Sequence, residues 1–86
     1  MEQGRLGKRR ALNWAGPRIR QIRTEQGISQ EMLSARCEAT GIILSRSTLA
    51  KIEIQLRCLT DIELLTIAGA LRVRVKDFFP ERPKLF

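Results

Sequence analysis

Two short helices joined by a loop, between Ser29 and Glu53, constrain the fold more than any other feature of the chain. Ser29 is a favourable N-cap, and the helix that it begins is expected to run to about Ala39. Ser45 caps a second helix, expected over residues 45–55. Apolar residues recur at helical spacing on one face of each helix, which predicts that this face is buried: Leu33 and Cys37, then Leu49 and Ile52.

Further helices are expected before and after this pair. One should begin at Gly16-Pro17, because proline is favoured in a first helical turn, and should end at Gly27. Another should begin at a capping box formed by Thr60 and Glu63. The same helical spacing predicts the buried positions of these two helices: Ile19, Ile22, Ile62, Leu65, Ala68 and Leu71.

The fold class predicted from these elements is an all-α domain of five helices, the last of them a turn that stops at Pro80. The domain is expected over residues 16–80. A basic and flexible arm of residues 1–15 should precede it, and a tail of residues 81–86 should follow it.

Two apolar features lie outside the predicted helices. Trp14, just before the first helix, is expected to pack on the edge of the core, with stacking on a nucleic acid as the alternative. The connector Ile42-Ile43-Leu44 is expected to lie against the core instead of in water.

Positive charge is concentrated at the start of the chain. Residues 1–23 hold seven basic side chains against the single acid Glu2, in a chain of 86 residues with a net charge of +7. A basic segment of this kind indicates a polyanionic partner, either a nucleic acid or an acidic membrane surface. The alternative without a binding function is that basic termini improve solubility.

Neither catalysis nor metal binding is expected. The chain has no histidine, and Cys37 and Cys58 lack the CxxC spacing of a metal or redox site. The sequence contains no glycine-rich phosphate loop and no useful pair of carboxylates, so neither an enzyme nor a cofactor is predicted. No apolar stretch is long enough for a membrane span or an export signal, so free thiols and a cytoplasmic location are expected.

From about residue 16 to residue 80 the chain resembles the Cro/C1-type (Xre-like) helix-turn-helix domains of phage repressors and bacterial regulators. The matching motifs are Ile22-Arg23 before Gly27, Ser29-Gln30-x-x-Leu33, the run from Ser45 to Glu53, and the run from Glu63 to Val73. The resemblance implies the five-helix lambda-repressor-like fold. Two departures are a longer connector before Ser45, and Gln55 where the family often has glycine, which would cost roughly 1 kcal/mol if its backbone is left-handed.

The resemblance also implies roles for individual residues. Base reading is implied for the exposed side of the second helix of the pair: Arg46, Ser47 and Lys51. Contacts with the DNA backbone are expected from Ser29, Gln30, Thr48, Arg57, Arg9 and Arg10. Arg23 and Glu53 should form a structural ion pair that fixes the recognition helix. The alternatives are that the polar side chains of residues 45–55 only face solvent, and that Arg9 and Arg10 bind nothing.

We therefore expect a sequence-specific regulator of transcription that binds double-stranded DNA and acts as a repressor. One recognition helix contacts few base pairs, so a homodimer on a palindromic operator is expected. The expected setting is a bacterial or phage-type cytoplasm, in association with the nucleoid. The alternative is an antitoxin of the same fold, which neutralises a toxin protein through an apolar face.

Overall fold

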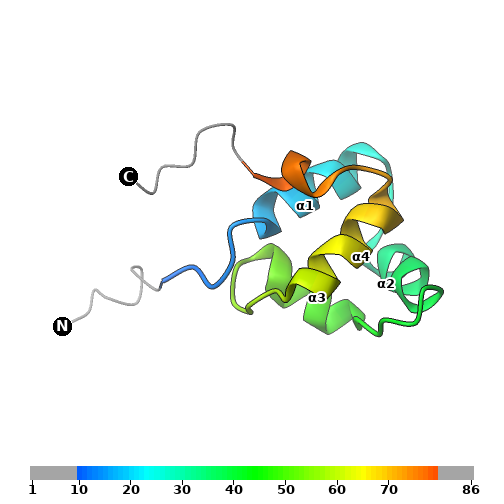
Figure 1. Ribbon diagram of the computed structural model, residues 1–86, viewed down its shortest axis with the longest axis horizontal. Helices are drawn as coiled ribbons and strands as arrows, with labels where there is room; N and C mark the ends of the chain where they lie inside the picture. Colours follow the sequence, from blue (N-terminus) through cyan, green and yellow to red (C-terminus); the bar gives the residue numbers. More distant parts are fainter. Residues whose placement is uncertain (1–9, 80–86) are drawn as a thin grey trace.

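The computed structural model describes residues 10–79, which form four α-helices and one short 3-10 helix. In chain order these are α1 (Gly16–Glu25), α2 (Gln30–Glu38), α3 (Arg46–Glu53), α4 (Asp61–Leu71) and η2 (Val75–Phe78). Figure 1 shows η2 beside α1 at the top of the molecule, α3 below and α2 at the right, with α4 between them. The described residues contain no strand, in agreement with the all-α class that was predicted.

The fifth helix expected from the sequence is a single 3-10 turn, η2. The backbone N–H of Arg74 donates to the Asp77 carboxylate at 3.0 Å, which closes this turn locally. Phe79 follows in an extended conformation, with φ −121° and ψ 150°. A residue before proline is driven out of the helical region, so Pro80 prevents η2 from continuing as an α-helix.

Three helices begin at the side chains that the sequence marks as N-caps. The hydroxyls of Ser29 and Ser45 accept hydrogen bonds from backbone N–H groups in the first turns of α2 and α3, at 3.0 and 3.2 Å. Thr60 and Glu63 form the predicted reciprocal capping box at α4. Each cap satisfies amide groups that have no partner inside the helix, and so determines where that helix starts.

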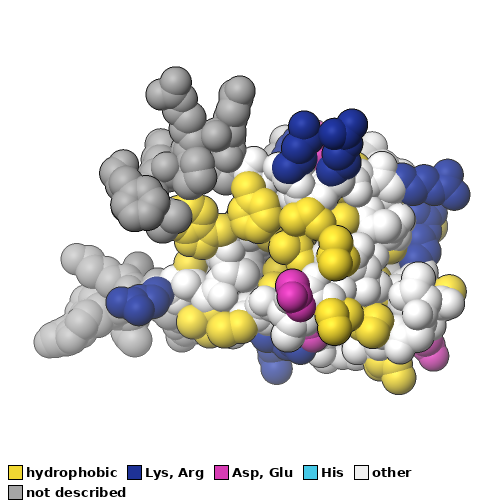
Figure 2. All heavy atoms as spheres, in the orientation of Figure 1, with side chains coloured by type: hydrophobic (Ala, Val, Ile, Leu, Met, Phe, Trp, Pro, Cys, Tyr) yellow, Lys and Arg dark blue, Asp and Glu magenta, His cyan; other side chains and the backbone are white. Residues whose placement is uncertain are grey.

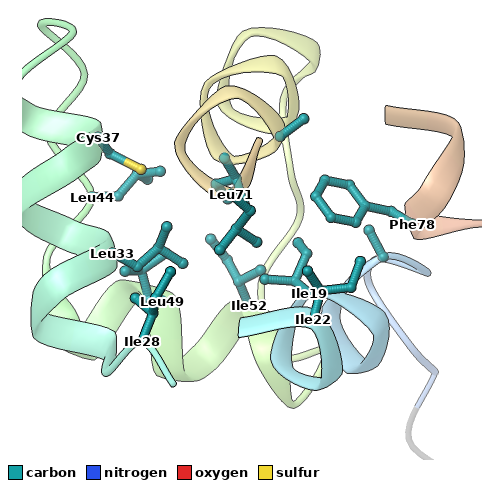
Figure 3. Packing of buried hydrophobic residues seen from close by; sticks show 13 residues of the cluster. Ile19, Ile22, Ile28, Leu33, Cys37, Leu44, Leu49, Ile52, Leu71 and Phe78 are labelled. Carbon is teal, nitrogen blue, oxygen red and sulfur yellow. The ribbon is translucent and has the colours of Figure 1, made fainter. Parts of the chain in front are cut away.

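One apolar cluster lies between the helices. Figure 3 shows Leu71 of α4 near its centre, with side chains of α2 on one side and Phe78 of η2 on the other. α3 contributes Leu49 and Ile52, which are fully buried, so the core sets the orientation of α3. The buried members of the cluster are Ala15, Ile19, Ile22, Ile28, Leu33, Cys37, Leu44, Leu49, Ile52, Ile67, Ala68, Leu71 and Phe78.

The buried stripe of α4 differs from the one predicted. Ile62 and Leu65 are 59% and 63% exposed, whereas Ile67, Ala68 and Leu71 are buried. Apolar residues occupy most of the circumference of α4, so helical spacing alone could not decide which side faces the core. The side with Ile62 and Leu65 forms an apolar surface, which we call the α4 face.

The segment before α1 is attached to the end of α3, although a flexible arm was expected over residues 1–15. Leu12 N donates to Gln55 O at 3.0 Å, and Ala15 is buried in the core. The folded unit therefore includes this segment from Leu12 onward. Residues 1–9 lie outside the described residues.

Asn13 forms a close junction between this segment and α3. Its Nδ2 donates to the carbonyl oxygens of Ile52 and Arg57 at 3.0 and 2.8 Å, and its Oδ1 accepts a hydrogen bond from Gly16 N at 2.7 Å. A Cβ at Gly16 would collide with Ile52 O. Only glycine therefore allows α1 to start this close to the last turn of α3.

The two apolar features outside the helices are partly buried. In the connector, Leu44 is buried and Ile42 is half-buried, as expected, but Ile43 is 78% exposed. Trp14 is 41% exposed, and it lines a groove of about 260 Å³ together with Leu64. Trp14 therefore lies at the edge of the core and keeps part of its ring on the surface.

Candidate nucleic-acid interface

The last turn of α3 is fixed to α1 by a buried ion pair between Arg23 and Glu53. Arg23 Nε donates to Glu53 Oε2 at 2.7 Å, and Nη2 donates to Oε1 at 3.0 Å. A third bond, from Arg23 Nη1 to Ile28 O at 2.7 Å, orients the guanidinium. The hydrogen bond to Glu53 raises the pKa of Arg23 against the opposing effect of burial, so Arg23 stays charged. The two residues are thus placed together as the sequence suggested.

Gln30 joins the same cluster from α2. Its Nε2 donates to Glu53 Oε1 at 3.0 Å, and the side chain is half-buried. α1 and the first turn of α2 are therefore both bonded to the Glu53 carboxylate, which holds them to the last turn of α3. The sequence suggested only a contact with DNA for Gln30, because nothing in its local pattern points to Glu53.

One side of α3 is open to solvent. Arg46, Ser47 and Lys51 are exposed, and Thr48 is half-buried. The Ser45 hydroxyl lies 3.1 Å from the Ser47 hydroxyl and donates to Thr48 Oγ1 at 3.0 Å. Ser47 and Lys51 lie one helical turn apart, and Arg46 is next to Ser47. The three residues expected to read bases are therefore all accessible, with Ser47 and Lys51 on one side of α3 and Arg46 about 100° around the helix from Ser47.

Arg46 lies close to an acid on the neighbouring helix. Arg46 Nε is 3.1 Å from Glu31 Oε2, and the two side chains are 62% and 68% exposed. Glu31 is in the first turn of α2, so this pair bridges the starts of α2 and α3. Glu31 was not among the residues expected in the site, although its position next to Gln30 was a signal that could have included it.

Arg57, expected to contact the DNA backbone, is engaged within the protein. Its Nη1 and Nη2 each donate to a Glu63 carboxylate oxygen at 2.9 Å, and Nη1 also donates to Cys58 O at 3.0 Å. The hydrogen bonds from Arg57, together with those from Thr60, lower the pKa of Glu63 from its usual 4.5 to about 2. Glu63 was expected only as a capping residue. Its carboxylate neutralises most of the positive charge of Arg57.

Gln55, just after α3, has the left-handed backbone that glycine often provides at this place. Its φ is +67°, and its side-chain Nε2 donates to Asn13 O at 3.0 Å. The side chain of Gln55 therefore offsets part of the backbone strain by fastening the segment before α1.

Most exposed basic side chains lie outside α3. α3 itself exposes Arg46 and Lys51, and Glu31 stands beside Arg46. The others that are exposed among residues 10–79 are Arg10, Arg20, Arg36, Arg72, Arg74 and Lys76. Figure 2 shows a group of basic side chains at the upper edge, near the place of η2 in Figure 1 and away from α3. The open side of α3 is thus only weakly basic.

Three further properties of residues 10–79 concern metal binding, membrane insertion and thiol chemistry. Among residues 10–79, no three histidine, cysteine or acidic side chains are grouped to hold a metal ion. No helix in the same range is long and apolar enough to cross a membrane. Cys37 and Cys58 are free thiols, and burial raises the pKa of Cys37, which makes it less reactive.

Two short helices joined by a loop, α2 and α3, the second with exposed polar side chains, are the arrangement of a helix-turn-helix domain, a class that binds DNA. A family model described as helix-turn-helix, of the Cro/C1 type, matches residues 19–78. The chain therefore belongs to the Cro/C1-type helix-turn-helix family of DNA-binding regulators. Comparisons with curated proteins and with solved structures gave no significant match.

Proposed function

We propose that this protein regulates transcription by binding a specific sequence of double-stranded DNA with α3 in the major groove. The observation that supports this most strongly is the contrast along α3, which is exposed at Arg46, Ser47 and Lys51 and fixed at Glu53. A helix held in this way can present donors to base edges without losing order on binding. Arg46 would donate two hydrogen bonds to a guanine, and Lys51 would contact a neighbouring base.

Contacts with phosphates position the domain in this proposal. The start of α2 has backbone N–H groups without a partner in the helix and the positive end of the helix dipole, which favour an anion. The phosphate contacts that we propose are Ser29, Gln30, Thr48, Arg9 and Arg10. Arg57 adds less than the sequence suggested, because Glu63 neutralises it.

Repression by a homodimer completes the proposal. One α3 contacts only a few base pairs, so two copies on a palindromic operator would supply the specificity, and a dimer over a promoter would exclude the polymerase. We place the contact between copies at the α4 face, with Ile62 and Leu65. Figure 2 shows hydrophobic side chains spread across the side of the molecule where α4 lies in Figure 1. An exposed apolar surface of this kind is typical of an interaction site.

Selection of bound DNA from a random pool of duplexes, at physiological salt, tests the proposed function. The wild-type protein should enrich an inverted repeat with half-sites about one helical turn apart. The variant Arg46→Ala/Lys51→Ala should enrich no such motif. The matched control Arg20→Ala/Arg74→Ala removes the same charge away from α3 and should still enrich it. Tight binding without any enriched motif would contradict the proposal.

The α4 face also supports a second candidate function, an antitoxin whose apolar surface covers a toxin protein. Sedimentation of the free protein separates the two candidates. A dimer that Leu65→Glu converts to a monomer supports self-association at this face. A wild-type protein that stays monomeric at high micromolar concentration contradicts the homodimer and favours a different protein partner for the α4 face.

A further inference from the structure

The pair formed by Glu31 and Arg46 is unexpected on a surface proposed to meet DNA. A carboxylate in the first turn of α2 stands where phosphates would approach, and it repels them. Both side chains are more than 60% exposed, so their attraction adds little to the stability of the fold. An acid in the first turn of α2 interacts favourably with the positive end of the helix dipole, but this interaction does not require a partner on α3. General affinity for DNA does not account for an acid at this position.

The geometry of the pair leaves the reading edge of Arg46 available. The closest approach joins Arg46 Nε to Glu31 Oε2 at 3.1 Å. The other edge of the guanidinium, formed by Nη1 and Nη2, can still donate two parallel hydrogen bonds to guanine O6 and N7. A free arginine side chain loses much rotamer freedom when it makes such bonds. A carboxylate that restricts Arg46 beforehand reduces that loss.

The first turn of α2 is itself held in place, which strengthens the restriction of the Arg46 side chain. Glu31 follows Gln30, and the Gln30 side chain is bonded to the buried Glu53. The first turn of α2 is therefore a fixed platform, and Glu31 projects from it toward the start of α3. Glu31 and Arg46 belong to different helices, so their contact depends on how α2 and α3 are positioned relative to each other.

We propose that Glu31 is a positioning residue that makes the base preference of Arg46 stricter at some expense of affinity. This inference rests on the proposed function. The carboxylate orients the guanidinium toward a guanine and repels phosphates and base edges that carry only acceptors beside it. Glu31 therefore weakens binding to every sequence, and it weakens binding to the wrong sequence more.

The test measures binding of the whole chain to the selected duplex and to a duplex in which the guanine assigned to Arg46 is replaced. In Glu31→Gln we expect tighter binding to both duplexes and a fall of about two- to five-fold in their affinity ratio, the range for an exposed ion pair. Glu38→Gln is the matched control, because it removes the same charge from the other end of α2, and its ratio should equal that of the wild type.

Two further readings complete the test. In an Arg46→Ala background, Glu31→Gln should leave the ratio unchanged, because the effect acts through Arg46. In the free protein, the NMR order parameter of the Arg46 Nε–H bond should fall in Glu31→Gln and stay constant in Glu38→Gln. These readings distinguish positioning from a general change of charge.

The outcomes are distinguishable. If the wild type prefers the selected duplex and Glu31→Gln keeps the same ratio, the role of Glu31 is overturned and the proposed function stands. If the ratio falls equally in the Arg46→Ala background, Glu31 acts without Arg46 and the inference is also overturned. If the wild type binds both duplexes equally, both the proposed function and the role of Glu31 are overturned.

Discussion

The two halves of α3 differ sharply in how they are held. At the end of the helix, Glu53 binds Arg23 of α1 and Gln30 of α2, and Asn13 binds the Ile52 carbonyl. At the start, Arg46 forms an exposed ion pair with Glu31, and the Ser47 hydroxyl is bonded to that of the neighbouring cap Ser45. The polar bonds of α3 therefore divide into a buried set that fixes the helix and an exposed set that is easily exchanged.

This difference shows how a small domain can combine order with binding. A side chain whose bonds hold the fold is costly to release for a ligand, because those bonds would have to break on binding. In this chain the two tasks belong to different residues of one eight-residue helix. Substitutions of the buried residues of α3 should therefore affect folding, and those of its exposed residues should affect recognition.

The largest effect should come from the buried end. Arg23→Ala leaves Glu53 charged, buried and without its main partner, and should lower the free energy of unfolding by about 3–5 kcal/mol. Chemical denaturation followed by circular dichroism measures this. The control Arg20→Ala, on the exposed side of α1, should change it by less than about 0.5 kcal/mol. Equal effects of the two variants would remove the distinction between the halves of α3.

The open start should behave in the opposite way. Arg46→Ala should leave the free energy of unfolding within about 0.5 kcal/mol of the wild-type value, because the ion pair of Arg46 with Glu31 is exposed. It should reduce discrimination at one base pair by about 1–3 kcal/mol, measured by competition with single-substituted duplexes. Gln30→Ala should instead weaken binding to all sequences similarly and also lower stability, since Gln30 bonds Glu53. A loss of stability in Arg46→Ala would contradict the division of α3 into residues that hold the fold and residues that bind.

The pair of Arg57 and Glu63, in the loop after α3 and at the start of α4, should make the stability of the fold depend on pH. Arg57 holds the pKa of Glu63 at about 2 in the folded protein, below its usual 4.5. The ionised Glu63 therefore stabilises the fold above about pH 4.5, and this contribution is lost as the pH falls toward 2. Glu63→Gln should remove about 1–2 kcal/mol at neutral pH, a range reduced for the partial exposure of Arg57, and should flatten the acid limb of the stability curve. An unchanged acid limb would show that the pair does not form in solution.

The smallest expected effect concerns the left-handed backbone of Gln55, just after α3. It separates the cost of this backbone from the contribution of the Gln55 side-chain hydrogen bond. Arg72 and Gln55 both have positive φ, at +59° and +67°. Arg72→Gly should raise the free energy of unfolding by about 1 kcal/mol, because it relieves the left-handed backbone. Gln55→Gly relieves the same strain but loses the bond to Asn13 O, so its net change should be close to zero. Equal stabilisation by both variants would mean that the Gln55 side chain fastens nothing.

Local signals predicted much of the fold, and longer-range contacts explain what they could not. Ser29, Ser45 and the Thr60 capping box could be identified because a cap and its partner lie within one helical turn. The side of α4 that faces the core could not be identified, because this helix is apolar nearly all round and only its neighbours select Ile67 over Leu65.

In the candidate site, too, some features could be predicted from local sequence and others could not. The exposure of Arg46, Ser47 and Lys51 followed from the amphipathic pattern of α3, and the Arg23–Glu53 pair was implied by the family resemblance. Contacts between distant positions had no local signature: Gln30 with Glu53, Glu31 with Arg46, and Asn13 with Ile52. These contacts depend on how the helices pack, which no single segment of the sequence encodes.

In the proposed complex, the exposed side of α3 meets DNA, and the basic surface near η2, with Arg74 and Lys76, does not. NMR titration of the labelled protein with its selected duplex tests it directly, by the change of backbone amide shifts at each residue. We expect the largest changes at Gln30, Arg46 and Lys51, with those of Arg74 and Lys76 near zero. Changes centred on Arg74 and Lys76, with α3 unaffected, would show that DNA binds the basic surface and would contradict the role assigned to α3.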